Sequence, residues 1–442
     1  MLHFKLFTVS KLKFLFVIPA LLLLSACEEE QVLTEEERLA LEEQQQAENL
    51  NATLKSAVYD IMNEWYLWND QLPDVNPANY KDADELLNAM MFTPTDKWSY
   101  IQEEETYKSF FDDGEYQGYG LRMARDLEGN IRVAFVYNDS PFGRAGVERS
   151  WIIDKINGTS ISNIDGQTFS QLLSGDSHTF EFIKPDGTVA TESLSKSTIG
   201  INTVLSAEVI ERNNIKVGYL AFNSFLATSE EELNQAFQRF QSEGIQELVI
   251  DLRYNGGGRV NIAEWMASNI IGNAGTGRNF IVYSFNQDKS EELNESIPFT
   301  EPNVPLNLNR IVAITSRASA SASELLINGL RPFIEVKLIG DDTYGKPVGS
   351  FPFFVEGYAI SPISFKIVND QGIGDYYTGL KADAYVEDDL SHRLGDPSES
   401  RLREALHYLE NGTFSGTIAR SADATKNQQI EMRGFRQEIG AF

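Results

Sequence analysis

The chain has 442 residues, 42% of them hydrophobic and 11% aromatic, and a formal net charge of −28 at pH 7. This composition is typical of a protein that buries a core, and the length allows roughly two to four domains. Nucleic acid is excluded as a partner, because phosphate neutralisation requires clustered Lys and Arg, and the chain carries 37 of these against 65 Asp and Glu. Anionic lipid surfaces are disfavoured for the same reason.

The N-terminus has the pattern of an export signal. Three lysines precede the apolar run "FLFVIPALLLL", which is too short to span a bilayer but long enough for the core of a signal peptide. The run ends in "LSAC", which resembles the lipobox of bacterial lipoproteins, where the cysteine is lipidated. We therefore expect residues 1–27 to be a lipoprotein signal peptide with lipidation at Cys27. The protein would then be anchored in a bacterial cell envelope, at the outer membrane, on a face that the sequence leaves open.

Residues 28–50 read "EEEQVLTEEERLALEEQQQAENL", with many acids and no aromatic residue. Such a segment cannot bury enough apolar surface to fold alone, so it is interpreted as an acidic tether. An acidic run directly after the lipidated cysteine resembles a surface-export signal of some Gram-negative lineages. A solvated spacer is the alternative interpretation. Since Cys27 is the only cysteine, disulfides are excluded.

The rest of the chain divides by its periodicity into four segments. Residues 51–113 have helical spacing and form a small helical module, whereas 114–198 contain short strands with Asn-Gly and Asp-Gly turns, which predict a β-rich domain. Strands and helices alternate over 199–412, which predicts an α/β core with a largely parallel sheet. Residues 413–442 are a polar C-terminal tail. The fold class is therefore a multi-domain α/β protein.

Three loops follow predicted strands of this core. Ser321 lies in "SRASASASELLINGL" at the start of a helix, in capping-box spacing with Glu324, so it could be only a helix cap. Small neighbours and free N–H groups at a helix start would also suit a nucleophile. Lys346 lies in "LIGDDTYGKPVGS", where it could be a solvated charge; Pro347 excludes a phosphate-binding P-loop. The third loop, "DLRYNGGGR", is either a plain turn or a backbone donor site.

Parallel strands bring their carboxyl ends to one edge of a sheet, so these loops are expected to meet. A serine at a helix start, a lysine and a glycine loop are the set that acyl transfer needs.

At these residues the chain resembles the C-terminal processing (tail-specific) serine peptidases. The resemblance is carried by "SASASE" around Ser321, by "GK" with Lys346 twenty-five residues later, and by "DLRYNGGG", and it extends over about 51–411. Within it, "SPFGRAGV" and "IIDKINGTSI" resemble a PDZ domain, with Gly118, Tyr119, Gly120 and Leu121 as the carboxylate-binding loop. The sequence "ERSW" at 148–151 departs from the usual Gly-Asp turn of that domain.

The resemblance implies a Ser-Lys dyad with Ser321 as nucleophile and Lys346, as a neutral amine, as general base. A lysine pKa of about 10.4 must fall towards neutrality for this role, which burial without a carboxylate partner can achieve. Asp341 and Asp342 must therefore point away. The implied oxyanion hole consists of the backbone N–H groups of Ala322 and of a glycine, Gly257 or Gly258.

Two positions depart from the family pattern and affect the orientation of Lys346. Pro332 occupies a position that is often acidic, and Ser350 one that is often glutamine. Ser350 and Asn328 are the candidates that would orient the lysine. No cofactor or metal is expected.

The sequence thus predicts a serine endopeptidase that binds unstructured, apolar protein C-termini through a PDZ-like domain and hydrolyses peptide bonds in the cell envelope. One alternative is a non-catalytic peptide-binding lipoprotein on the same fold. A small-ligand binder is a further alternative, resting on fold analogy alone.

Overall fold

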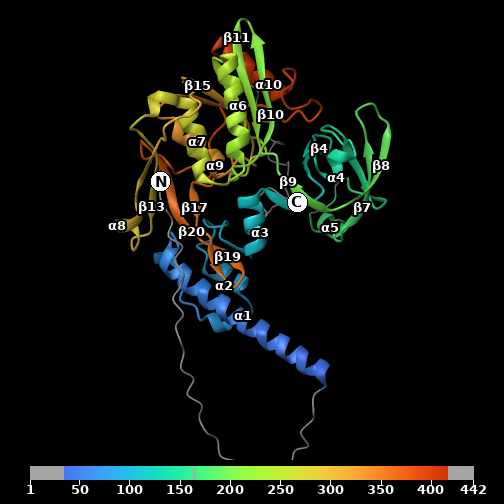
Figure 1. Cartoon of the computed structure of the whole chain (residues 1–442), viewed down its shortest axis with the longest axis vertical. Helices are drawn as coiled ribbons and strands as arrows, with labels where there is room; N and C mark the ends of the chain where they lie inside the picture. Colours follow the sequence, from blue (N-terminus) through green and yellow to red (C-terminus); the bar gives the residue numbers. More distant parts are fainter. Residues whose placement is uncertain (1–33, 163, 165, 417–442) are drawn as a thin grey trace, which may run out of the picture. The chain divides into compact units, whose positions relative to one another are not determined.

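The computed structural model describes residues 34–162, 164 and 166–416 (Figure 1). Cys27, the first part of the predicted tether and residues 417–442 lie outside the described residues. The chain divides into two compact units, Met1–Asn49 and Leu50–Phe442, which are described separately below. Across the described ranges, no helix combines the length and apolar character needed to cross a membrane.

In the first unit, the predicted tether is helical from Glu35 onward. Helix α1 (Glu35–Trp65) begins sixteen residues before the expected start of the helical module. Its residues 35–49 are exposed, so they gain stability from helix-forming side chains and from pairs one turn apart, instead of from burial. Arg38 pairs with Glu35 at 2.5 Å and with Glu42 at 2.8 Å.

In the second unit, the predicted helical module shares its core with strands from the last third of the chain. Leu54, Val58 and Met62 of α1 pack with α2 (Ala83–Met90), and the apolar cluster also includes Val348, Ile360 and Ile363. Strand β1 (Tyr100–Glu103) pairs antiparallel with β19 (Tyr358–Ser361), which pairs with β18 (Phe353–Val355). Local periodicity cannot reveal such a pairing. Short helical elements complete this part: η1 (Asn69–Gln71), η2 (Pro77–Asn79), α3 (Glu104–Lys108) and the π-helical turn η3 (Ser109–Asp113).

The β-rich segment is bracketed by a two-stranded antiparallel ribbon of β2 (Glu115–Gly118) and β9 (Ser197–Gly200). Between them lies an antiparallel sheet in the order β3-β4-β5-β7-β8, with β6 beside β5. Its members are β3 (Leu121–Arg125), β4 (Ile131–Val136), β5 (Ile152–Ile156), β6 (Thr159–Ser160), β7 (Ser177–Ile183) and β8 (Val189–Ser195), with helices α4 (Pro141–Arg144) and α5 (Gly166–Leu172). Phe142, Ile153 and Phe182 lie in its buried cluster.

The core contains a six-stranded sheet in the order β10-β11-β12-β15-β16-β21. Strand β10 is antiparallel to β11, and each later pair is parallel. Its strands are β10 (Val204–Arg212), β11 (Ile215–Phe222), β12 (Glu247–Asp251), β15 (Arg310–Thr315), β16 (Glu335–Gly340) and β21 (Ala384–Tyr385). A second sheet has the order β14-β13-β20-β17, formed by β14 (Ser296–Pro298), β13 (Asn279–Phe285), β20 (Ile363–Asn369) and β17 (Val348–Ser350).

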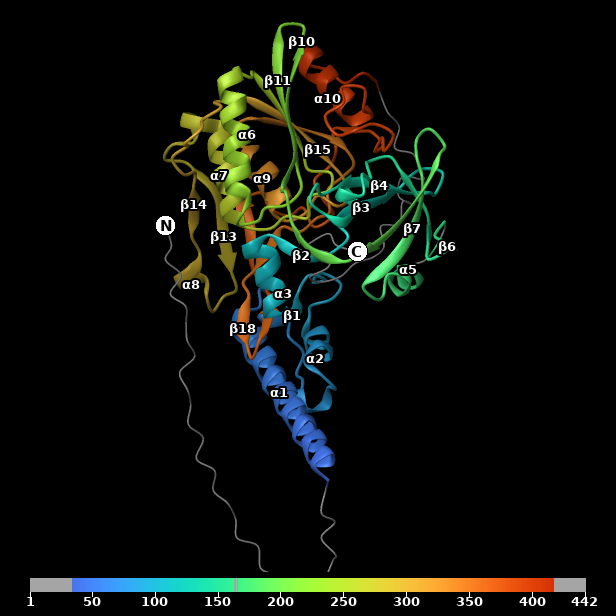
Figure 2. The same cartoon turned by 45° about the vertical axis from the view of Figure 1, so that its right-hand side comes forward.

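Helices cover both faces of the six-stranded sheet because its buried strands are apolar on both faces. Leu220 and Phe222 face one layer, built from α6 (Ser229–Glu243), α7 (Val260–Ile271) and α9 (Ala322–Leu330). Tyr219 and Val249 face the other, where α10 (Ser400–Asn411) packs. Figures 1 and 2 both show α6 and α7 side by side. Two short elements, η4 (Gly272–Gly275) and α8 (Ser290–Leu293), flank β13. The beginning of the predicted tail packs on α10, where Phe414 stacks on Tyr408.

The two halves of α1 should differ in their contribution to stability. Met62 has no exposed surface, so Met62→Ala should lower the free energy of unfolding by about 2–5 kcal/mol. Glu43 lies in the exposed half, and Glu43→Ala should change it by less than about 0.5 kcal/mol. Denaturant unfolding of the full chain measures both values. Equal effects of the two substitutions would contradict the assignment of the core to the second half of the helix.

Candidate active site

Ser321 lies at the turn between β15 and α9, where it is the N-cap residue of the helix. Its φ of 53° is in the left-handed region, which non-glycine residues rarely adopt. A sharp strand-to-helix turn of this kind presents the side chain away from the sheet, beside the first N–H groups of the helix. Ala322 is the first helical residue, so its N–H belongs to this set.

The glycine loop, which is the segment "DLRYNGGGR" at residues 251–259, lies directly against Ser321. A Cβ atom added to Gly257 would come within 2.8 Å of the Ser321 Cβ and 3.0 Å of the Ala322 N. One added to Gly258 would come within 2.2 Å of the Phe225 carbonyl oxygen. Both glycines also have positive φ, 110° and 132°. Only glycine fits these positions, for steric and conformational reasons.

Asn255 joins the glycine loop to the serine loop. Its side-chain oxygen accepts the N–H of Gly257 at 2.9 Å, and its backbone oxygen accepts the N–H of Ala320 at 3.2 Å and the hydroxyl of Ser323 at 3.1 Å. The N–H of Gly257 is therefore engaged, and Gly258 becomes the better candidate for an oxyanion donor.

The alternating serines around Ser321 also have a structural explanation. Ser319 donates to the Leu252 carbonyl at 2.7 Å, as Ser323 does to that of Asn255. Two of the three small hydroxyl groups thus clamp the serine loop onto the neighbouring strand end.

Glu324 connects the serine loop (residues 316–321, between β15 and α9) to the lysine loop (residues 341–347, between β16 and β17). Its side chain is fully buried, and one carboxylate oxygen accepts the backbone N–H groups of Ser321 at 3.0 Å and of Lys346 at 2.8 Å. The other oxygen accepts the N–H of Gly345 at 2.7 Å and the hydroxyl of Thr343 at 2.5 Å. Sequence reasoning identified Glu324 only as a capping partner, since nothing local indicates the contacts made by residues 343–346.

Burial raises the pKa of Glu324 to about 7, although the hydrogen bonds from Thr343, Lys346, Gly345 and Ser321 oppose this shift. The cause is the loss of water around a carboxylate that has no cationic side chain among its hydrogen-bond donors.

Lys346 is 6% exposed, and the neighbouring Asp342 has no exposed surface. Asp342 accepts hydrogen bonds from Lys381 at 2.9 Å, Tyr385 at 2.7 Å and the Ala382 N–H at 3.1 Å. Although burial opposes its ionisation, these bonds keep the pKa of Asp342 below its usual value. Its carboxylate thus joins the lysine loop to residues 381–385, and Arg317 lies 3.5 Å from the same carboxylate.

The two residues considered for orienting Lys346 lie in different surroundings. Ser350 is on β17, opposite Ile363 of β20, four residues after the lysine. The Asn328 amide donates to the Ile373 carbonyl at 2.8 Å and accepts from Asn369 at 3.3 Å. Asn328 therefore holds the turn after β20, and an orienting role for either residue stays a prediction.

The predicted carboxylate-binding loop spans the end of β2 and the start of β3. The Gly120 carbonyl accepts the Tyr137 N–H at 2.9 Å, and the Tyr119 hydroxyl is hydrogen-bonded to His178. Burial raises the pKa of Tyr116, whose phenol oxygen accepts the N–H of Gly120. One donor of this loop is thus engaged within the chain.

The turn "ERSW" keeps the backbone geometry of a glycine turn. Ser150 has a φ of 85°, and its N–H donates to the Val133 carbonyl at 3.0 Å. Within residues 34–162, 164 and 166–416, no group of three or more His, Cys, Asp or Glu is arranged to hold a metal ion.

Comparisons with known proteins agree with this geometry. The family model "Peptidase family S41" matches residues 216–379, and "Peptidase S41 N-terminal domain" matches 53–100. A candidate S41 protease from Bacteroides fragilis superposes with a TM-score of 0.67 at 25% identity, over 80% of this chain and 97% of that one.

Two curated relatives carry names of the same kind. A carboxyl-terminal-processing protease of Picosynechococcus is 29% identical over 60% of this chain. The chloroplastic carboxyl-terminal-processing peptidase 3 of Arabidopsis thaliana is 26% identical over 59%. The chain spans 63% and 51%, respectively, of the length of these relatives.

The fold is similar to that of a serine-type peptidase. More specifically, the matches at 216–379 and 53–100 are to the two models of peptidase family S41. The two matched ranges leave residues 101–215, which include the β-rich segment, between them.

The raised pKa of Glu324 predicts a pH dependence of stability. The folded state holds this proton up to a pKa of about 7 and the unfolded state only to its usual 4.5, so the contribution of Glu324 to stability decreases as pH rises between these values. The slope is at most about 1.4 kcal/mol per pH unit. Glu324→Gln cannot titrate, so its loss of stability per pH unit between pH 5 and 7 should be smaller by up to about 1.4 kcal/mol. Denaturant unfolding at both pH values tests this, and equal slopes would contradict it.

Proposed function

We propose that the protein is a serine endopeptidase that uses Ser321 and Lys346 as a catalytic dyad. The observation that carries this proposal is the Glu324 carboxylate, one oxygen of which binds the backbone of both residues. A helix cap or a solvated lysine would not require such a connection, since neither depends on the position of the other.

In the proposed reaction, the Ser321 oxygen attacks the peptide carbonyl while the Lys346 amine accepts its proton. The negative charge on the carbonyl oxygen is stabilised by the N–H groups of Ala322 and Gly258. The tetrahedral intermediate then collapses, the C–N bond breaks, and Lys346 returns the proton to the leaving amine. A water molecule hydrolyses the acyl-serine by the same route, with Lys346 again as base.

The surroundings of the lysine support this role. Lys346 is 6% exposed, and the hydrogen bond from its N–H to Glu324 fixes its backbone beside the serine loop.

We propose that substrates are unstructured protein C-termini held by the β-rich segment as a PDZ-like domain. An extended tail would pair with the edge of β3, and its carboxylate would reach the loop Gly118–Leu121. Since the chain carries a net charge of −28, apolar tails without acidic residues suit it best. Lipidation at Cys27 would place the enzyme in a bacterial cell envelope, at the outer membrane.

The second candidate is a peptide-binding protein without catalysis. One observation favours it. The Asn328 amide is hydrogen-bonded to Ile373 and Asn369, so Ser350 is the one remaining candidate, of the two considered, for orienting Lys346 as a base. The two functions differ in whether Ser321 forms an acyl intermediate.

The dyad predicts the effect of two substitutions on cleavage of an unfolded reporter with an apolar tail. Ser321→Ala and Lys346→Ala should each lower kcat/KM at least about 1,000-fold, because each removes a group that acts in the chemical step. Lys337→Ala, on the half-exposed part of β16, is the matched control and should retain activity. Cleavage by the Ser321→Ala variant would exclude the dyad. Binding of the tail without cleavage by the parent protein would establish the second candidate.

The Tyr116 hydroxyl should compete with a substrate tail for the N–H of Gly120. Tyr116→Phe removes this acceptor, so a peptide with a free carboxylate should bind about 3- to 10-fold more tightly. Fluorescence anisotropy with the Ser321→Ala protein measures the affinity, and the C-terminally amidated peptide is the control. An equal gain for both peptides would show that the loop does not bind the carboxylate.

A further inference from the structure

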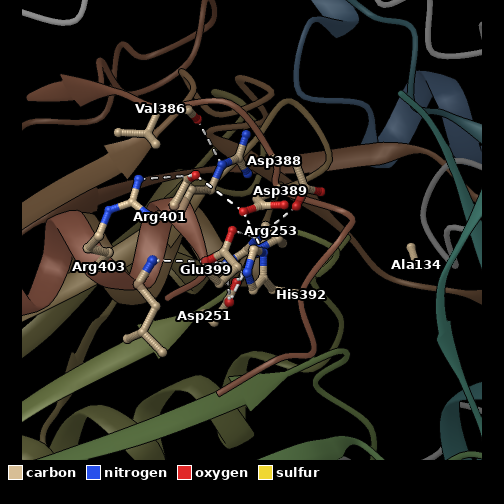
Figure 3. A network of polar contacts seen from close by, with 12 residues as sticks. Ala134, Asp251, Arg253, Val386, Asp388, Asp389, His392, Glu399, Arg401 and Arg403 are labelled. Atoms are coloured by element: carbon tan, nitrogen blue, oxygen red, sulfur yellow. Dashed lines mark hydrogen bonds and ion pairs between the residues drawn. The ribbon is translucent and has the colours of Figure 1, made fainter. Parts of the chain in front are cut away.

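A buried ionic network lies at the base of the glycine loop. Arg253, which is 1% exposed, is surrounded by three carboxylates (Figure 3). Its guanidinium contacts Asp251 at 2.7 Å, Asp388 at 2.7 Å and Glu399 at 2.9 Å. Such a cluster is stable only when every charge is paired, since a single buried charge without a partner is strongly destabilising.

This network supports both loops of the candidate active site. Arg253 begins the loop that continues through Tyr254 and Asn255 to the glycines. Its carbonyl accepts the Ser316 hydroxyl at 2.5 Å, at the start of the serine loop. A shift of the Arg253 backbone would therefore move the oxyanion donor relative to Ser321.

A second guanidinium enters the network from the β-rich segment. Arg149 lies between α4 and β5, and 7% of its side chain is exposed. It contacts Asp388 at 3.1 Å, the Tyr254 hydroxyl at 2.8 Å and the His392 carbonyl at 2.7 Å. The carbonyl oxygens of Asp389 and Ala134 accept its remaining N–H groups, at 3.1 and 2.6 Å. All five donors of the guanidinium are thus used, and four of the five acceptors belong to the core.

Asp388 is the point at which the two guanidinium groups meet. One of its oxygens accepts from both Arg253 and Arg149, and the other accepts from Tyr254 at 2.5 Å. Although burial opposes its ionisation, Arg253 and Arg149 hold the pKa of Asp388 well below its usual range. Removal of Arg149 would leave Asp388 and the Tyr254 hydroxyl each without one partner.

The backbone beside Arg149 is itself fixed. Ser150 adopts its left-handed conformation and its carbonyl accepts Arg132 at 2.9 Å, while its N–H is bound by Val133. Arg149 therefore projects from a rigid turn, and the position of its guanidinium follows the position of the sheet that carries it. This is the turn at which the sequence departs from the usual Gly-Asp pattern.

We propose that Arg149 is a positioning residue for the glycine loop. Its guanidinium fixes Tyr254 directly and Arg253 through Asp388, and so holds the Gly258 N–H at the distance from Ser321 that oxyanion stabilisation requires. The active site is then complete only while the β-rich segment stays against the core. This inference rests on the proposed peptidase function.

The test is steady-state cleavage by the full chain of two reporters, one with a free apolar tail and one with an amidated tail. Arg149→Ala should lower kcat at least about 30-fold on both reporters and change KM less than about 3-fold, since loss of an oxyanion donor affects the transition state. A peptide aldehyde that forms a tetrahedral adduct with Ser321 should lose affinity by the same factor. Arg144→Ala, an exposed arginine of the same segment, is the matched control and should behave as the parent protein.

Tyr254→Phe provides a second test that preserves the packing of the ring. Tyr254→Phe should also lower kcat. In the double variant with Arg149→Ala, the loss of kcat should be smaller than the sum of the two separate losses in free energy, because both residues belong to one network. Arg149→Lys keeps the charge but not the five donors, so it should recover only part of kcat.

An unchanged kcat in a folded Arg149→Ala variant would overturn the inference, as would a loss confined to KM for the free tail. Failure of the proposed function looks different. In that case cleavage would persist in Ser321→Ala, or the parent protein would not cleave either reporter.

Discussion

The candidate active site depends on one buried carboxylate. Glu324 accepts four hydrogen bonds, from Ser321, Thr343, Gly345 and Lys346, and these donors come from two loops that follow different strands. Without this carboxylate, several buried N–H groups would lose their acceptor, and the lysine loop would be joined to the serine loop only by contacts such as the bond from the Tyr344 N–H to the Ser319 carbonyl. Because its pKa is near 7, the protonation state of Glu324 changes close to neutral pH. All four partners of Glu324 are hydrogen-bond donors, so a proton on the carboxyl would lie close to one of them. The four hydrogen bonds are therefore strongest when the carboxyl is ionised.

The other elements of the site are arranged around this connection. Asn255 and the side chains of Ser319 and Ser323 fasten the serine loop to the glycine loop, and the Arg253 network forms a base beneath both. The parallel strands β12, β15 and β16 bring the loops to one edge, as expected for ligand sites in such sheets. The contacts of Arg149 extend the base to the β-rich segment. Catalytic geometry in this account is therefore a property of several segments that are distant in sequence.

The sequence predicted the parts that depend on local pattern. The three loops and the α/β core follow from strand and helix periodicity, and the positions of Ser321, Lys346 and the glycines follow from family motifs. Long-range pairings could not be predicted in this way. The pairing of β1 with β19, the contacts of Glu324 with Gly345 and Lys346, and the insertion of Arg149 beside Asp388 join residues with no local signal. The helical form of residues 35–49 was also missed, because a segment that buries nothing can still extend a helix that is nucleated elsewhere.

If the proposed dyad operates, Ser321 is a nucleophile that Lys346 activates. The most direct measurement is the rate at which a serine-directed fluorophosphonate labels the full chain, with the modified residue identified by mass spectrometry. We expect a single adduct on Ser321, formed much more slowly in Lys346→Ala at the same pH. Labelling at the same rate in that variant, or no adduct on Ser321 in the parent protein, would contradict the proposed dyad.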